Sequence, residues 1–159
     1  DHNRLFRKCK RVLAKIRDHV EGNTNARWVS VEGDAAGIVS STEEEMDEIL
    51  RIIESLTLHS DLTFERNSIY LRFSHRAYRK GTCLQEAANR WGLECDKILA
   101  IGDNYNDLSM LQPEICEACG CPSNAIREVR DYVTERGGKV AANPGSVGVM
   151  EVMKHYFDQ

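Results

Sequence analysis

Apolar residues in the first part of the chain recur first with helical spacing and then with strand spacing. Residues 4–20 carry apolar side chains three and four positions apart, with basic residues between them, which predicts an amphipathic helix. Residues 27–32 and 35–40 are predicted as two short strands joined by a hairpin-type turn at Gly33 and Asp34.

A second helix and a second hairpin follow. Thr42 and Glu45 have the spacing of a helix capping box, and the apolar positions over 46–56 keep a helical period. Residues 62–64 and 69–73 alternate apolar and polar side chains, which is typical of strands with one buried face. This order predicts a small α+β layer in which helices cover one side of an antiparallel sheet.

After residue 76 strands and helices alternate. The predicted elements are a helix around 84–91, a strand over 97–102, a helix from about Asn106, a strand near 115–119, a helix over 126–133 capped by Ser123, a strand near 139–142 and a last helix that includes Met150 and Phe157. The nearly continuous apolar run at 97–102 is typical of a parallel strand buried on both faces. We therefore predict an α/β fold with a doubly wound parallel sheet over 77–159, and a separate α+β unit over 1–76.

Composition restricts the partners. The 159 residues carry 21 basic and 25 acidic side chains, a net charge of 21 − 25 = −4. Because there is no basic surplus, we expect no nucleic-acid partner. No apolar run approaches the roughly 18 residues that a membrane span needs, and the first residues lack the apolar core of a signal peptide. We expect no membrane partner and a cytoplasmic protein.

Two carboxylates follow the buried strand. Asp103 would lie at its carboxyl end and Asp107 four residues later, in the first turn of the next helix, pointing back to the same space. Ligands of parallel sheets bind at this edge, and oxygen ligands of this kind suit Mg²⁺, which takes one or two carboxylates and keeps several waters. The alternative is a turn in which Asn106 or Asp107 only caps a helix.

Lys80 precedes the predicted helix around 84–91. The unit of helix, turn and strand that follows returns the chain to the sheet after 23 residues, which is short enough to bring Lys80 beside Asp103. Its ammonium group would there offset the charge of a carboxylate and of a phosphoryl group.

These segments resemble a known family. Lys80-Gly81 and the run Gly-Asp-Asn-Tyr-Asn-Asp-Leu-Ser-Met-Leu at 102–111 resemble the third and fourth motifs of the haloacid dehalogenase superfamily. The resemblance is to its Cof-like and sucrose-phosphate-phosphatase-like members with an inserted α+β cap; 123–125 and 148–149 match that group loosely. It implies that 77–159 are the C-terminal half of a Rossmann-like core and that 1–76 are part of a cap.

The resemblance also implies an activity. It is Mg²⁺-dependent hydrolysis of a small phosphorylated metabolite, such as a sugar phosphate, through an aspartyl-phosphate. Asp103 would bind the metal, Asp107 would bind it directly or through water, and Lys80 would steady charge on the nucleophile and the transferring group. Asn106 would contact the phosphate or a metal-bound water.

One departure from the family pattern matters. The family's nucleophile lies in an Asp-x-Asp motif, and the 159 residues contain no such motif. We therefore expect that the chain lacks the N-terminal half of its core and is inactive alone, and that the unpaired edge of strand 97–101 promotes self-association. The alternative is a non-catalytic, Mg²⁺-binding or regulatory module.

Six cysteines indicate reduced thiols in a reducing compartment. Cys9 and Cys83 are predicted on apolar helix faces, where a thiol packs as a small hydrophobe. Cys116, Cys119 and Cys121 are predicted as thiols of a core strand. A soft-metal site or a redox site is the less favoured alternative, because no Cys or His pair follows nearby to complete four zinc ligands.

Overall fold

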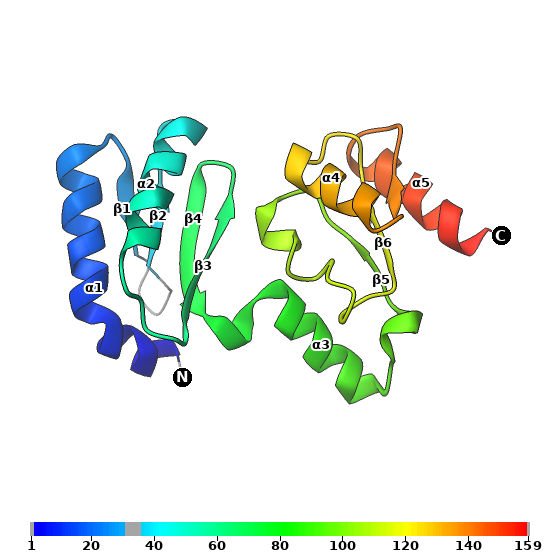
Figure 1. Ribbon diagram of the computed structural model, residues 1–159, viewed down its shortest axis with the longest axis horizontal. Helices are drawn as coiled ribbons and strands as arrows, with labels where there is room; N and C mark the ends of the chain where they lie inside the picture. The colour runs from blue at the N-terminus through cyan, green and yellow to red at the C-terminus, as the bar shows by residue number, and fades with distance from the viewer. Residues whose placement is uncertain (1, 31–35, 159) are drawn as a thin grey trace. The chain divides into compact units, whose positions relative to one another are not determined.

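The chain divides into two compact units. A computed structural model describes residues 2–30 and 36–158. The first unit comprises Asp1–Tyr78 and the second Arg79–Gln159. Figure 1 shows the elements of both.

The first unit is an antiparallel sheet with two helices. Its elements are α1 (His2–Asn23), β1 (Arg27–Val29), β2 (Gly37–Val39), α2 (Glu43–Ser55), β3 (Leu62–Asn67), β4 (Tyr70–His75) and the 3₁₀ helix η1 (Arg76–Tyr78). The strand order is β1-β2-β4-β3. The predicted order of helix, two strands, helix and two strands is confirmed, whereas the predicted turn at Gly33 and Asp34 lies outside the described residues.

One face of this sheet carries the core. Ile38 pairs with Leu71, and Phe64 pairs with Phe73, so these side chains share a face. Leu71 and Phe73 are buried and alternate with the exposed Tyr70 and Arg72, as predicted for strands with one buried face, until the buried Ser74 ends the alternation. The side chains pack with buried residues of α1 and α2, including Ile16, in a single apolar cluster.

The predicted capping box of α2 forms only in part. Thr42 is the N-cap, and its hydroxyl accepts the N–H of Glu45. The Glu45 carboxylate does not return to Thr42 but accepts the N–H groups of Ser41 and Asn25, each at 2.6 Å. Glu45 thereby ties the start of α2 to the segment that leads into β1.

The second unit is an α/β layer around a parallel sheet. Its elements are α3 (Lys80–Trp91), η2 (Cys95–Lys97), β5 (Leu99–Ile101), η3 (Tyr105–Asp107), β6 (Ala118–Cys121), α4 (Arg127–Glu135), β7 (Lys139–Val140) and α5 (Gly145–Phe157). The strands are parallel in the order β5-β6-β7. The predicted α/β fold with a parallel sheet is confirmed.

Three local predictions for this unit are wrong. The helix expected from Asn106 is only the 3₁₀ turn η3, followed by turns, because Pro113 cannot continue a helical hydrogen-bond ladder. The strand expected near 115–119 begins at Ala118. Ser123 does not cap α4, whose N-cap is Ile126 without a side-chain cap.

A close helix contact holds α5 against the sheet. A Cβ atom on Gly120 of β6 would lie 2.4 Å from Cγ1 of Val152, which is fully buried in α5. The absent side chain lets the helix approach the centre of the three-stranded sheet. Among the described residues, no helix has the length and apolar character that a membrane crossing needs.

Candidate functional site

The loop that follows β5 borders a cavity at the carboxyl ends of the parallel strands. The cavity has a volume of about 410 Å³. It is lined by Lys80, Ile101, Gly102, Asp103, Asp107, Met110, Pro122, Gly145 and Val149. The structure thus brings together three of the predicted site residues, Lys80, Asp103 and Asp107, at the edge of a parallel sheet where ligands bind.

The buried Asp107 side chain holds the backbone of the loop after β5 in place. Its Oδ2 accepts the backbone N–H of Asp103 at 2.9 Å and that of Asn104 at 3.1 Å. The Asn104 side chain accepts in return from the first residues of η3, which completes a capping box. Asp107 is almost fully buried, with 3% of its surface exposed. The capping alternative is therefore present in the structure, and it coexists with a position on the cavity wall.

Lys80 reaches Asp107 because α3 docks closely on the following loop. A Cβ atom on Gly81 would lie 2.1 Å from the backbone oxygen of Ser109, so only glycine permits this approach. The Gly81 N–H donates to the Ser109 hydroxyl at 3.1 Å. Next to this contact, the Lys80 ammonium pairs with Oδ1 of Asp107.

The two carboxyl groups have pKa values shifted in opposite directions. Burial would raise the pKa of Asp107, but the ammonium of Lys80 and the two backbone N–H groups hold it below its ordinary value. The Asp103 carboxyl is partly desolvated and lies near the Asp107 charge, and both effects raise its pKa. The loop therefore holds one compensated carboxylate beside one whose charge is only partly offset.

The sequence matches a family model over most of its length. Residues 14–143 match the model of haloacid dehalogenase-like hydrolases. The chain belongs to the haloacid dehalogenase-like hydrolases. This confirms the resemblance read from the segments around Lys80 and 102–111.

Two relatives of this chain carry names that refer to phosphate esters. A phosphoglycolate phosphatase from Methanothrix thermoacetophila is 30% identical over 111 residues, which cover 70% of this chain and 46% of that protein. A glucosylglycerol-phosphate synthase from Pseudomonas anguilliseptica is 32% identical over 111 residues, 69% of this chain and 14% of that protein. The chain thus spans less than half the length of these relatives.

Solved structures share the fold of this haloacid dehalogenase-like hydrolase. The sucrose-phosphatase of Synechocystis sp. PCC6803, solved with sucrose and phosphate, superposes with a TM-score of 0.69 at 14% identity and covers 92% of this chain and 61% of that one. A Thermoplasma acidophilum protein gives a TM-score of 0.61 at 20% identity, over 89% of this chain and 60% of that one. These likenesses show the fold.

Asn106 does not line the cavity of the hydrolase fold. Its side-chain Oδ1 is buried without a hydrogen-bond partner among the described residues. Its backbone oxygen accepts the Ser109 hydroxyl at 3.4 Å. A contact between Asn106 and phosphate therefore stays a prediction that this arrangement does not favour, since η3 directs Asp107 and not Asn106 to the cavity.

Pro122, Gly145 and Val149 also line the cavity, and they lie in or beside two segments that the sequence indicated only through the loose family match. The N–H of Gly145, at the start of α5, donates to Oδ1 of Asn124 at 2.6 Å. The N–H of Ile126 donates to the backbone oxygen of Asp103 at 3.0 Å. These bonds connect the loop after β6 with both the Asp103 loop and α5. No local periodicity predicts that connection, because its partners are about twenty residues apart.

The cysteines of β6 and the loop before it are packing groups. Cys116, Cys119 and Cys121 are buried free thiols, and burial raises the pKa of Cys121 to about 11. Within residues 2–30 and 36–158, no three His, Cys, Asp or Glu side chains are grouped to hold a metal. The burial of these thiols favours the core interpretation over a soft-metal or redox site. Cys9 is buried as predicted, but Cys83 is exposed, so the expectation that it packs on an apolar face is wrong.

Proposed function

We propose that this chain supplies the lysine-bearing and Mg²⁺-binding side of a phosphomonoesterase site. The observation that supports it is the convergence of Lys80, Asp103 and Asp107 on one cavity at the carboxyl end of β5. The chain belongs to a hydrolase family, and a relative named as a phosphatase supports the reaction class. Because the chain spans less than half of those relatives, the activity of the whole protein is part of the proposal.

The donor set suits a hard divalent cation. Asp103 and Asp107 offer carboxylate oxygens, and Mg²⁺ takes one or two of these and keeps waters in its other positions. Lys80 and two backbone N–H groups already occupy the oxygens of Asp107. We therefore assign the direct ligand role to Asp103 and a water-mediated role to Asp107. The cation would supply positive charge next to the phosphoryl oxygens.

Lys80 would act on the charge of the reacting groups. In the reaction that the family resemblance implies, a carboxylate attacks phosphorus, an aspartyl-phosphate forms, the alcohol leaves and water then releases phosphate. Lys80 holds a positive charge beside the cavity, and the buried Asp107 fixes its position. A fixed cation there offsets the charge on the nucleophile and on the transferring group without reorganisation.

The substrate class follows from the relatives and from the size of the site. We propose a small phosphorylated metabolite, because the relatives named above act on or make such compounds according to their names. The cavity volume of about 410 Å³ lies within the range of small-molecule sites. The free cysteines are in keeping with the reducing conditions of the cytoplasm, where we place the protein.

Metal binding tests the site directly. Isothermal titration of the full chain with Mg²⁺ is expected to show saturable binding that Asp103→Asn weakens at least about tenfold, since a direct ligand is lost. The matched control is Asp131→Asn on the exposed side of α4, which is expected to bind like the wild type. If both variants bound Mg²⁺ with equal affinity, Asp103 would not be a ligand of the cation.

Catalysis requires a separate measurement, because no Asp-x-Asp motif lies in the 159 residues. The chain alone is expected to hydrolyse no p-nitrophenyl phosphate. Adding a segment that bears the Asp-x-Asp strand of this family is expected to produce Mg²⁺-dependent hydrolysis that Lys80→Met abolishes. Mg²⁺ binding without hydrolysis in that mixture would favour the non-catalytic, regulatory alternative.

The free edge of β5 is the proposed self-association surface. In the described part of the chain β5 pairs only with β6, so one edge of the parallel sheet carries unpaired backbone groups. Such an edge is a template for pairing with another chain. Light scattering coupled to size exclusion is expected to show a mass that rises with concentration, and a monomer at all concentrations would contradict the proposal.

A further inference from the structure

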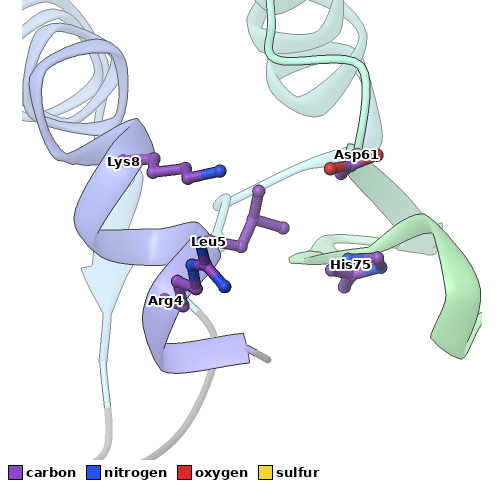
Figure 2. Close-up of a pocket in the computed structure, with 5 residues that line it drawn as sticks. All are labelled: Arg4, Leu5, Lys8, Asp61 and His75. Carbon is purple, nitrogen blue, oxygen red and sulfur yellow. The ribbon is translucent and has the colours of Figure 1, made fainter.

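The first unit contains a cavity of its own, which shares no lining residue with the site described above. It has a volume of about 240 Å³ and is lined by Arg4, Leu5, Lys8, Asp61 and His75. Figure 2 shows Arg4 and Lys8 on the α1 side, with Asp61 and His75 opposite. The cavity thus has one wall from the first turns of α1 and one from the ends of the β3–β4 hairpin.

The α1 wall is positively charged. Arg4 and Lys8 are four residues apart, so they lie on the same face of the helix, and Leu5 lies between them with only 4% of its surface exposed. Neither cation forms an ion pair with another of the described residues. The Leu5 side chain adds apolar surface to this wall, and Arg4 and Lys8 add its two cationic groups.

The opposite wall presents a carboxylate. Asp61 directly precedes β3, and two hydrogen bonds hold its backbone in place. The Asp61 backbone oxygen accepts the N–H of Arg76 at 2.7 Å, and the Asp61 N–H donates to Nδ1 of His59 at 3.1 Å. The Asp61 carboxylate lies 3.7 Å from the same Nδ1. That nitrogen accepts a hydrogen bond from Asp61, so in neutral His59 it has no hydrogen to offer the carboxylate.

His75 completes this wall in a fixed orientation. Its Nδ1 accepts the N–H of Ala77 at 3.1 Å, and its ring packs edge-on against Tyr78 with a centroid separation of 5.5 Å. In the neutral form, the ring hydrogen is then on Nε2. The imidazole adds a polar group to the carboxylate wall and does not contribute a second negative charge.

Opposite charges therefore face each other without contact. No ion pair within 4.0 Å joins Asp61 to Arg4 or Lys8 among the described residues. Both charges nevertheless act on the same thiol: burial first, and then Asp61, raises the pKa of Cys9, whereas Lys8 lowers it. The space between the walls is thus bounded by two cations on one side and one anion on the other.

We propose that this cavity binds a small zwitterion of the α-amino-acid class, with its carboxylate toward Arg4 and Lys8 and its ammonium toward Asp61. A simple anion would meet the Asp61 carboxylate, and a simple cation would meet Arg4 and Lys8. A zwitterion satisfies both walls at once, with charge-assisted hydrogen bonds at each end. A volume of about 240 Å³ is slightly below the usual range for drug-sized ligands and suits a molecule of this size.

Three matched probes test the charge requirement. Nitrogen-15 NMR of the full chain is titrated with L-alanine, with propionate, which lacks the ammonium, and with ethylamine, which lacks the carboxylate. L-alanine is expected to shift the amide signals of Leu5, Lys8 and Asp61 saturably, and each single-charge probe is expected to bind at least about tenfold more weakly. Equal binding of propionate would show a simple anion site, and no shift with L-alanine would also overturn the proposal.

Variants identify the groups that bind. Arg4→Gln and Asp61→Asn are each expected to raise the dissociation constant for L-alanine about tenfold or more. Lys10→Gln is the matched control, because Lys10 is an exposed cation on another face of the same helix and does not line the cavity. All three positions are exposed, so the fold is expected to tolerate the changes. Wild-type affinity in Asp61→Asn, or an equal loss in Lys10→Gln, would overturn the assignment.

Discussion

Asp107 packs directly against the Cα atom of Gly102, so the end of β5 has no space for a side chain. A Cβ atom on Gly102 would lie 2.4 Å from Cβ of Asp107 and 2.9 Å from its Cγ. The carboxylate reaches the backbone N–H groups of the loop because this space is free. Gly102 therefore allows the Asp107 carboxylate to occupy its position, and it also allows the chain to turn after β5.

Gly102→Ala is expected to displace the Asp107 side chain. The backbone N–H groups of Asp103 and Asn104 would then lose their hydrogen bonds to the Asp107 carboxylate. We expect the free energy of unfolding to fall by about 2–3 kcal/mol. Urea unfolding measures this loss. Gly22→Ala is the control, because no atom lies within 4 Å of the added Cβ and α1 should become slightly more stable. Equal effects of the two changes would contradict the packing argument.

The Lys80–Asp107 pair predicts a pH-dependent stability. The folded-state pKa of Asp107 lies below the ordinary value of 3.8, so its ionised form adds stability above that value, and this contribution is lost as the pH falls through the folded pKa. Lys80→Met should lower the free energy of unfolding by about 1 kcal/mol at neutral pH. The effect is modest because the Lys80 side chain is nearly half exposed, and solvent screens its charge. Urea unfolding of the variant and the wild type should therefore converge in acid. A difference that is independent of pH would contradict the role of this pair.

Asp103 is expected to behave in the opposite way. Its folded-state pKa is raised, so without a divalent cation its ionisation lowers stability as the pH rises from 3.8 through the folded pKa. Asp103→Asn should therefore stabilise the metal-free chain at neutral pH and remove the stabilisation by added Mg²⁺. Thermal unfolding with EDTA and with Mg²⁺ measures both effects. Destabilisation by Asp103→Asn in EDTA would show a structural role instead.

Arg136 is predicted to be a structural residue of the second unit. Its guanidinium donates to the backbone oxygens of Leu111, Cys116 (2.8 Å) and Glu117 (3.2 Å), which fixes the segment before β6. Arg136→Gln should cost about 2–3 kcal/mol, because charged hydrogen bonds to carbonyls are lost. Chemical unfolding compares it with Arg127→Gln. Arg127 makes one exposed pair with Asp131, so this control should lose no more than about 0.5 kcal/mol.

Thiol reactivity should follow exposure. Cys83 and Cys95 are exposed, whereas Cys116, Cys119 and Cys121 are buried, and burial raises the pKa of the last two. The first pair should react quickly with iodoacetamide in the native chain, and the buried thiols only on unfolding. Peptide mass spectrometry at increasing times measures the order. Rapid labelling of Cys119 would indicate a reactive site in β6.

The helices of the first unit and the carboxyl end of β5 were predictable because local patterns define them. The period of α2, the alternation along β4 and the run before Gly102 all depend on neighbours a few residues apart. The turn η3 was not predictable as a 3₁₀ turn, because the capping-box spacing of Asn104 and Asp107 is also how α-helices begin, and Pro113 follows too soon for a long helix.

By itself, the sequence determined which residue types follow β5 and that Lys80 lies near the start of a helix, because composition and spacing are properties of the chain; the helix begins at Lys80 itself, earlier than the predicted 84–91. Only the tertiary structure decided that Lys80 meets Asp107, that Asn124 holds Gly145 and that Arg4 and Lys8 face Asp61. Each of these relations joins residues about twenty or more positions apart. The packing of whole elements sets such distances, and no periodic pattern of side chains records them.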